Sequence, residues 1–241
     1  MPELTWLGIV RHGESTGNVA AAAAESGRLE QIDIPERDAD VPLSDTGREQ
    51  ADAVGTWLAE RRPDLVVVSP YLRTVQTAEI ALASLDFHVP VRRDERLRDR
   101  ELGILDLLTN HGVATRLPDE AARRKRLGKF YYRPPGGESW ADVALRLRGL
   151  LGDLRRDHDG GRVLLFGHEA VVFLLRYLIE GLTEQQLMEL AHDGTIANCS
   201  VTTWERTGDG PLEIVDFARV HHLHREGAEP THEEEVRAEP V

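Results

Sequence analysis

Two reactive patterns overlap in the stretch LGIVRHGESTGN, residues 7–18. Gly13 to Gly17 fits the G-x-S-x-G pattern of a serine hydrolase, in which Ser15 would be the nucleophile. In the alternative, Arg11 and His12 place a cation and an imidazole directly after an apolar run. A serine elbow also needs an oxyanion donor from an earlier loop, and only fourteen residues precede Ser15. The lack of room for this earlier loop argues against Ser15 and favours His12 as the nucleophile.

The imidazole of His12 indicates phosphoryl transfer as a candidate reaction. A neutral histidine can attack phosphorus and form a phosphohistidine, which divides one difficult displacement into two easier steps. The group in transit carries negative charge on its oxygens, so fixed guanidinium, imidazole and backbone N–H donors stabilise it. Arg11, Arg73, His168 and the turn at Gly13 offer donors of these kinds.

The elements expected around these residues alternate between strands and helices. Apolar runs at 5–10, 64–68 and 162–166 are typical of buried strands, and they lead into Arg11-His12, the turn before Arg73, and Gly167-His168. Helical patterns follow from Ser44, from 72–85, 136–157 and 170–182. This alternation predicts an α/β fold with three layers, α/β/α, and a mostly parallel central sheet. Ligands of such folds bind beyond the carboxyl ends of the strands, where the reactive residues are expected to converge.

Composition limits the organisation of the chain and its partners. Residues 1–220 are expected to form a single α/β domain, in which the charged, weakly periodic residues of about 94–136 form an inserted lid. Residues 221–241 are acidic and poor in large apolar side chains, so a disordered tail is predicted.

A net charge of −13 argues against nucleic acid as a partner. No apolar run approaches the roughly 20 residues of a membrane span, and the N-terminus has no signal-peptide pattern, so a cytoplasmic protein is expected. Cys199, the single cysteine, is interpreted as a core residue. An exposed apolar strand edge or helix could form a homodimer.

Four motifs occur in the order typical of one family: RHGES with Asn18, SPYLRTVQTA at 69–78, PGGES at 135–139 and FGHE at 166–169. Over residues 5–205 the chain thus resembles the histidine phosphatase superfamily, the phosphoglycerate-mutase-like clan. The resemblance implies that His12 is the nucleophile. It also implies that Arg11, Arg73 and His168 bind the phosphoryl oxygens, with Asn18 as a further donor.

The general acid is the position where the chain departs from the family pattern. Members usually place a glutamate four residues before a glycine, and the matching residue in the segment from Leu97 to Gly103 is Asp99. Its side chain is one methylene shorter. Glu101, two residues further on, would face the same side of an extended segment and is the alternative acid.

The resemblance implies a metal-independent phosphomonoesterase that hydrolyses a small phosphorylated metabolite without a cofactor. Two alternatives stay open. One is a phosphoglycerate-type mutase, which returns the phosphoryl group to another oxygen. The other is a phosphate-binding regulatory protein without turnover, which the aspartate at position 99 makes conceivable.

Three further clusters allow a functional and a structural interpretation. The run Arg123 to Arg126 could contact a second anionic group of the substrate or form a solvated helix face. The motif HHLH at 221–224 suggests a metal site, but adjacent histidines lack the convergent geometry that metals need, and no metal site is predicted. Residues 131–133 could stack on a ligand or pack the lid.

Overall fold

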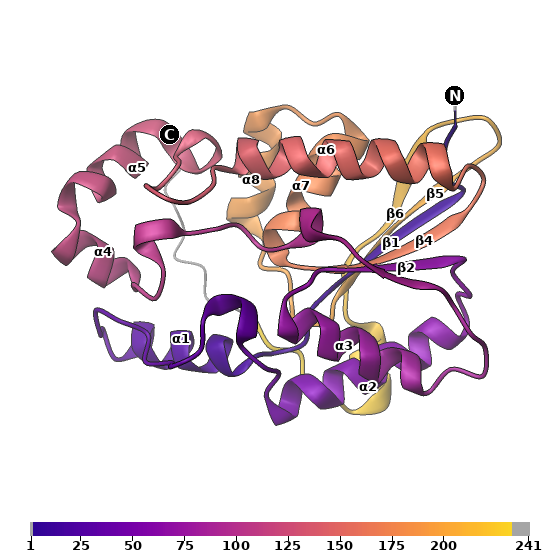
Figure 1. Cartoon of the computed structure of the whole chain (residues 1–241), viewed down its shortest axis with the longest axis horizontal. Helices are drawn as coiled ribbons and strands as arrows, with labels where there is room; N and C mark the ends of the chain where they lie inside the picture. Colours follow the sequence, from indigo (N-terminus) through magenta and orange to yellow (C-terminus); the bar gives the residue numbers. More distant parts are fainter. Residues whose placement is uncertain (1, 233–241) are drawn as a thin grey trace.

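The computed structural model describes residues 2–232 and, over this range, a six-stranded sheet with helices on both faces (Figure 1). The strand order is β3-β2-β4-β1-β5-β6. The strands are β1 (Trp6–Arg11), β2 (Leu65–Val68), β3 (Val91–Arg93), β4 (Arg162–Gly167), β5 (Val201–Arg206) and β6 (Leu212–Arg219). The first four pair in parallel, while β5 and β6 are antiparallel additions. The predicted three-layer fold with a mostly parallel sheet is confirmed.

The central strands are buried on both faces, which explains their continuous apolar runs. In β1, Leu7 and Ile9 contribute to one hydrophobic core while Trp6 and Val10 contribute to the other, because successive side chains of a strand point to opposite faces. The first core lies under α6 (Trp140–Asp157), α7 (Glu169–Glu180) and α8 (Glu184–Asp193). The second lies under α2 (Asp45–Ala59), α3 (Leu72–Ala83) and α9 (His221–Glu226).

Side-chain caps fix where several helices begin. Ser44 accepts a hydrogen bond from Gly47 N at the start of α2, as the sequence predicts. Ser139 caps α6 through a reciprocal capping box with Asp142. Ser15 caps α1 (Thr16–Ser26) in the same way. Each cap satisfies backbone N–H groups that have no partner inside the helix.

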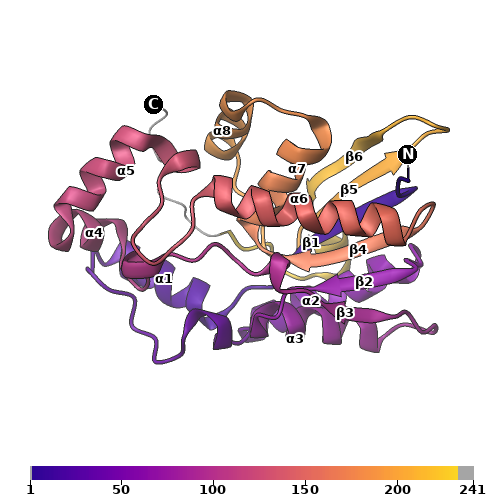
Figure 2. The ribbon, with the colours of Figure 1, turned by 45° about the horizontal axis from the view of Figure 1, so that its top comes forward.

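The inserted segment of about 94–136 is more helical than its weak periodicity suggests. It contains the short turns η2 (Glu95–Leu97) and η3 (Gly103–Leu105), followed by α4 (Asn110–Arg116) and α5 (Pro118–Tyr131). Only Phe130 of α5 is buried, so the helix needs no wide apolar stripe and gives little periodic signal. Together with α1, helices α4 and α5 lie beyond the carboxyl ends of the strands (Figure 2).

The first residues of the expected disordered tail have a defined structure. Residues 221–226 form α9, whose Leu223 is fully buried in the core beneath α2. Further along, Gln50 Nε2 donates hydrogen bonds to Glu229 O at 2.7 Å and Thr231 Oγ1 at 2.9 Å. The boundary at residue 220 is therefore wrong, because one leucine among polar neighbours anchors this segment. Residues 233–241 of the expected tail lie outside the described residues.

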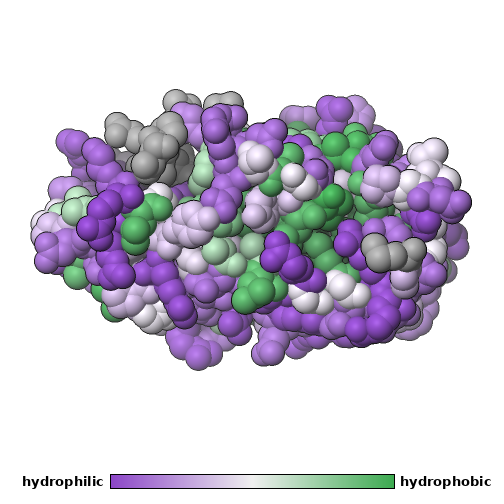
Figure 3. Space-filling model, turned by 90° about the horizontal axis from the view of Figure 1, so that it is seen from above, coloured by the Kyte–Doolittle hydropathy of each residue, from purple (hydrophilic) through white to green (hydrophobic). Residues whose placement is uncertain are grey.

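The surface above α6 to α8 is mainly hydrophilic, and its largest group of apolar side chains lies to the right of centre in Figure 3, with smaller groups elsewhere. Across residues 2–232, no helix combines the length and the apolar character that crossing a membrane requires. The homodimer stays a prediction.

Candidate active site

The register of the parallel strands brings the predicted reactive residues together. Arg11 pairs with Gly167 across β1 and β4, so His12 and His168 follow side by side. Their ring centroids are 5.2 Å apart. Val68 pairs with Phe166 across β2 and β4, which places the turn into α3, and hence Arg73, next to them. The expected convergence of the three strand ends is confirmed.

Arg11 lies fully buried at the base of this site. Its Nη1 donates to the carbonyl oxygen of Ile196 and lies 3.7 Å from Glu169 Oε1. Glu169 Oε1 also accepts the N–H of Ile196 at 2.9 Å. The first residue of α7 and the loop before β5 thus fix the guanidinium from two sides.

The tautomer of His12 follows from one hydrogen bond. Its Nδ1 lies 2.8 Å from the carbonyl oxygen of Gly13, which can only accept, so Nδ1 carries the proton and Nε2 carries the lone pair. Burial, followed by the positive charge of Arg73, holds the pKa of His12 well below its ordinary value of 6.5. The ring is therefore neutral near pH 7, the form that a nucleophile needs.

His168 is held in the complementary orientation. Ser69 Oγ lies 2.8 Å from its Nε2, and this hydroxyl oxygen accepts the N–H of Tyr71 at 3.4 Å. The hydroxyl proton of Ser69 is then available to Nε2, which leaves Nδ1 as the N–H of the neutral ring. Nδ1 is buried and lies 3.3 Å from Asp99 Oδ2. Burial above all holds the pKa of His168 well below 6.5.

The structure separates the two candidate acids. Asp99 Oδ2 lies 3.3 Å from Arg73 Nη2 as well as from His168 Nδ1, and the carboxylate lines the cleft above His12. The side chain of Glu101 is 49% exposed and accepts a hydrogen bond from Tyr71 Oη at 3.0 Å. Only Asp99 of this pair is brought to the histidines.

Ser15 and Asn18 bind each other at the start of α1. Asn18 Oδ1 accepts the N–H and the hydroxyl of Ser15, both at 2.9 Å, and Asn18 N donates to Ser15 Oγ at 3.1 Å. Ser15 is therefore engaged as a helix cap, which removes the basis for a serine elbow. The amide nitrogen of Asn18 is the end of this side chain that remains to donate into the cleft.

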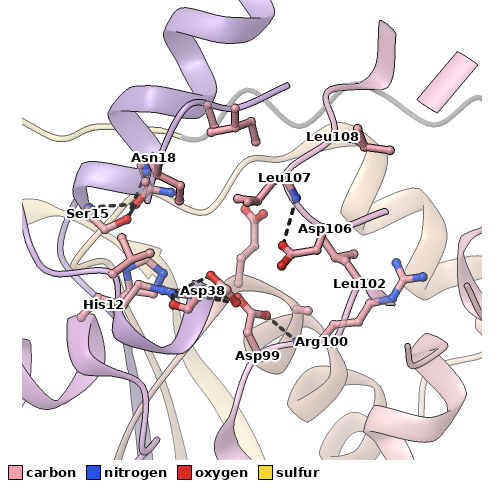
Figure 4. Close-up of a pocket in the computed structure, with 18 of the residues that line it drawn as sticks. His12, Ser15, Asn18, Asp38, Asp99, Arg100, Leu102, Asp106, Leu107 and Leu108 are labelled. Atoms are coloured by element: carbon pink, nitrogen blue, oxygen red, sulfur yellow. Dashed lines mark hydrogen bonds and ion pairs between the residues drawn. The ribbon is translucent and has the colours of Figure 1, made fainter. Parts of the chain in front are cut away.

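A cleft opens above these residues in two adjoining parts, and Figure 4 shows the part beside His12. The part beside His12, of about 230 Å³, is lined by Asn18, Arg73 and Asp99. The second part, of about 220 Å³, lies under the lid. Its lining includes the cations Arg100, Arg124 and Lys129.

The basic run of α5 divides between the cleft and the surface. Arg124 lines the second part of the cleft, and its Nη1 donates to Asn110 Oδ1 at 3.4 Å. Arg123 is 51% exposed and lies 3.9 Å from Glu120. Of these two neighbours, the structure places Arg124 where a substrate could reach it.

The aromatic residues of the lid also differ from each other. Tyr132 is buried and donates through Oη to Glu120 Oε2 at 2.8 Å, and its burial raises the pKa to about 12. Tyr131 is exposed. The packing interpretation therefore fits Tyr132.

The histidines of 221–224 form a helix rather than a ligand set. His222 is buried, its Nε2 lies 2.9 Å from Cys199 O, and burial lowers its pKa to about 4. Cys199 is buried as well, and burial raises the pKa of its thiol. In the range 2–232, no group of three or more His, Cys, Asp or Glu side chains is arranged to hold a metal ion.

Several site residues were not assigned roles from the sequence. Ser69 and Thr77 stand within the motif at 69–78, so the motif could have indicated them. Thr77 Oγ1 accepts the N–H of Gly13 at 3.0 Å and donates to Arg73 O at 2.7 Å. Asp38, which binds Arg73, lies in a polar loop without any motif, and no sequence signal indicates it.

Comparison with known proteins places this geometry in context. Residues 7–217 match the model of the histidine phosphatase superfamily (branch 1). The chain is 31% identical over 178 residues to the 6-phosphofructo-2-kinase/fructose-2,6-bisphosphatase of Aquarana catesbeiana, covering 73% of this chain and 33% of the relative. It is 31% identical over 220 residues to a phosphoglycerate mutase-like protein of Arabidopsis thaliana, covering 77% of this chain and 65% of the relative. The chain thus spans about a third of the bifunctional enzyme.

Solved structures show the same fold. A mycobacterial glucosyl-3-phosphoglycerate phosphatase in complex with VO3 is 27% identical, with a TM-score of 0.69 over 88% of this chain and 98% of that one. A mycobacterial hydrolase is also 27% identical, with a TM-score of 0.71 over 89% of this chain and 98% of that one.

Proposed function

Because the chain belongs to the histidine phosphatase superfamily, we propose that it is a metal-independent phosphomonoesterase that acts through a phosphohistidine. The observation that carries the proposal is the state of His12. This ring is neutral, its Nδ1 proton is committed to Gly13 O, and its Nε2 lone pair is available at the base of a cleft. The phosphatases among the similar proteins support the hydrolase assignment.

The first step transfers the phosphoryl group to His12. Nε2 forms the bond to phosphorus while the bond to the leaving ester oxygen breaks, and Asp99 in its acid form donates a proton to that oxygen. Arg73, His168 and Arg11 stabilise the charge on the phosphoryl oxygens, with the amide nitrogen of Asn18 as a further donor. Preorganised donors of this kind suit a group whose negative charge is spread over three oxygens.

The second step regenerates the enzyme. Asp99, now a carboxylate, takes a proton from a water molecule whose oxygen attacks phosphorus. The bond from phosphorus to His12 Nε2 breaks, and inorganic phosphate is released. Asp99 thus serves as acid and then as base, as its position beside His168 and Arg73 permits. The body of the substrate would occupy the second part of the cleft, where Arg100, Arg124 and Lys129 favour an anionic or hydroxyl-rich metabolite.

Phosphate release from a panel of phosphomonoesters tests this proposal. The panel contains a chromogenic aryl phosphate and 3-phosphoglycerate, and a chelator is present throughout. We expect release by the wild type and a loss of about a thousandfold or more in His12→Ala, because the nucleophile is removed. His222→Ala is the matched control, since this histidine is also buried but lies outside the cleft, and circular dichroism checks the fold of both variants.

The other outcomes identify the alternatives. Isomerisation of a phosphoglycerate without net phosphate release would indicate a mutase. Phosphate binding with no turnover of any ester would indicate a regulatory protein. Activity that disappears with chelator and returns with added metal would contradict the metal-independent mechanism.

A further inference from the structure

The carboxylate of Asp38 already binds the guanidinium of Arg73, which the proposed mechanism assigns to the phosphoryl group. Arg73 Nη1 donates to Asp38 Oδ1 at 2.8 Å, and Nη2 lies 3.4 Å from Asp38 Oδ2. The two oxygens thus face the two terminal nitrogens, which is how a planar guanidinium binds a carboxylate or a phosphate. Asp38 lies between His12 and Asp99 in the view of Figure 4.

The two partners differ in their freedom to move. The side chain of Arg73 is only 6% exposed, whereas that of Asp38 is 44% exposed. Arg73 Nη1 also donates to the backbone carbonyl of Asp38 at 2.6 Å. The carboxylate can therefore rotate towards solvent while the backbone carbonyl keeps the guanidinium in position.

Charge gives this contact a consequence for binding. Arg73 faces the carboxylate of Asp38 and the side chain of Asp99, and Arg11 faces the carboxylate of Glu169. Both histidines of the site are neutral. A phosphate dianion that enters the cleft therefore meets guanidiniums whose charge is largely compensated, and it is repelled by any carboxylate that stays.

We propose that Asp38 is an internal anion that competes with the phosphoryl group for Arg73, and that its carboxylate must leave Arg73 before substrate or phosphate can bind. This inference rests on the proposed function, because it takes Arg73 as a phosphate ligand. The apparent association constant for phosphate equals the intrinsic constant multiplied by the fraction of molecules in which Asp38 has left Arg73. The return of Asp38 to Arg73 then displaces the product phosphate and prepares the site for the next substrate.

Burial and the charge of Asp38 raise the pKa of Asp106, another residue that lines the first part of the cleft. The negative charge of Asp38 is thus felt across the space that the substrate would cross. This agrees with a role in the cleft rather than on the outer surface of its loop.

Isothermal titration calorimetry of the full chain with inorganic phosphate at pH 7.5 tests the proposal. In Asp38→Asn the backbone carbonyl remains but the competing charge is lost. We expect phosphate to bind about tenfold more tightly, the factor that applies if Asp38 leaves Arg73 about a tenth of the time. Asp40→Asn is the matched control, because Asp40 belongs to the same turn but pairs with the exposed Arg37 at 2.6 Å. Its affinity should equal that of the wild type.

Weaker phosphate binding by Asp38→Asn would overturn the proposal and show that the carboxylate holds Arg73 in place for the ligand. Unchanged binding would also overturn it. Asp38→Ser, which leaves no carboxylate or amide, should give the same increase and guards against a defect peculiar to asparagine. Because binding is measured without turnover, failure of the proposed hydrolysis would appear separately, as tighter phosphate binding by a protein that hydrolyses no ester.

Discussion

At the scale of single residues, the role of each acidic side chain in the candidate site follows from the groups that its oxygens contact. The shorter acid at position 99 reaches both His168 and Arg73, so the lost methylene does not take the carboxylate out of the site. Arg146 supports this position, because its Nη2 donates to the backbone carbonyl of Asp99 at 2.9 Å. The longer Glu101 is directed to Tyr71 instead.

The two acids can be distinguished by a matched pair of amide variants. We expect Asp99→Asn to lower kcat by roughly 10²- to 10⁴-fold, the usual contribution of general acid–base catalysis, because an amide can neither donate the proton nor activate water. Glu101→Gln should retain most of the activity. The measurement is kcat and KM with an aryl phosphate. A large loss in Glu101→Gln with an active Asp99→Asn would reverse the assignment.

At the scale of elements, the start of α2 supports the loop that carries His12. Glu14 O accepts the N–H of Ser44 at 2.9 Å, and Glu14 N donates to Gln50 Oε1 at 2.9 Å. Gly47 allows this contact, because a Cβ there would overlap the carbonyl oxygen of Glu14 and lie 2.9 Å from its carbonyl carbon. The helix and the loop approach each other backbone to backbone.

A pair of glycine variants tests this approach. Gly47→Ala should destabilise the protein by about 1–3 kcal/mol, the usual cost of overpacking, and should also reduce activity because the loop of His12 must shift. Gly152→Ala is the control within α6, where a Cβ would meet nothing within 4 Å. There the better helix propensity of alanine should stabilise the fold by about 0.5–1 kcal/mol. Urea unfolding measures both effects, and equal stability of the two variants would contradict the close contact.

At the scale of the whole molecule, buried neutral histidines link stability to pH. His12, His168 and His222 all have pKa values lowered by burial. Below about pH 6.5 the unfolded chain binds protons that the folded protein does not accept at these positions. Their contribution to stability is therefore present above pH 6.5 and is lost as the pH falls.

Unfolding by urea at pH 7.5 and pH 5.5 should reveal this linkage. Each histidine that stays neutral in the folded protein lowers the free energy of unfolding by about 1 kcal/mol over this interval, so the three together lower it by roughly 3 to 4 kcal/mol. In His222→Gln the pH dependence should decrease by about a third. Equal or greater stability at pH 5.5 would show that these histidines become charged within the fold.

The sequence by itself determined the layers of the fold and which motifs converge at the candidate site. Apolar runs without alternation indicate strands buried on both faces, and β1, β2 and β4 are such strands. Since parallel strands end at one edge of a sheet, the motifs around His12, Arg73 and His168 had to meet. These signals are local, so a single sequence contains them.

Only the tertiary structure decided the contacts between segments far apart in the chain. Asp99 and Glu101 would face the same side of an extended segment, and only the positions of Tyr71 and His168 separate them. The carboxylate of Asp38 binds Arg73, which lies 35 residues further along the chain. Helix α9 is held in place because Leu223 packs into the core beneath α2. A polar loop or a short helix gains its structure from distant partners, and no periodicity within the segment records which partners those are.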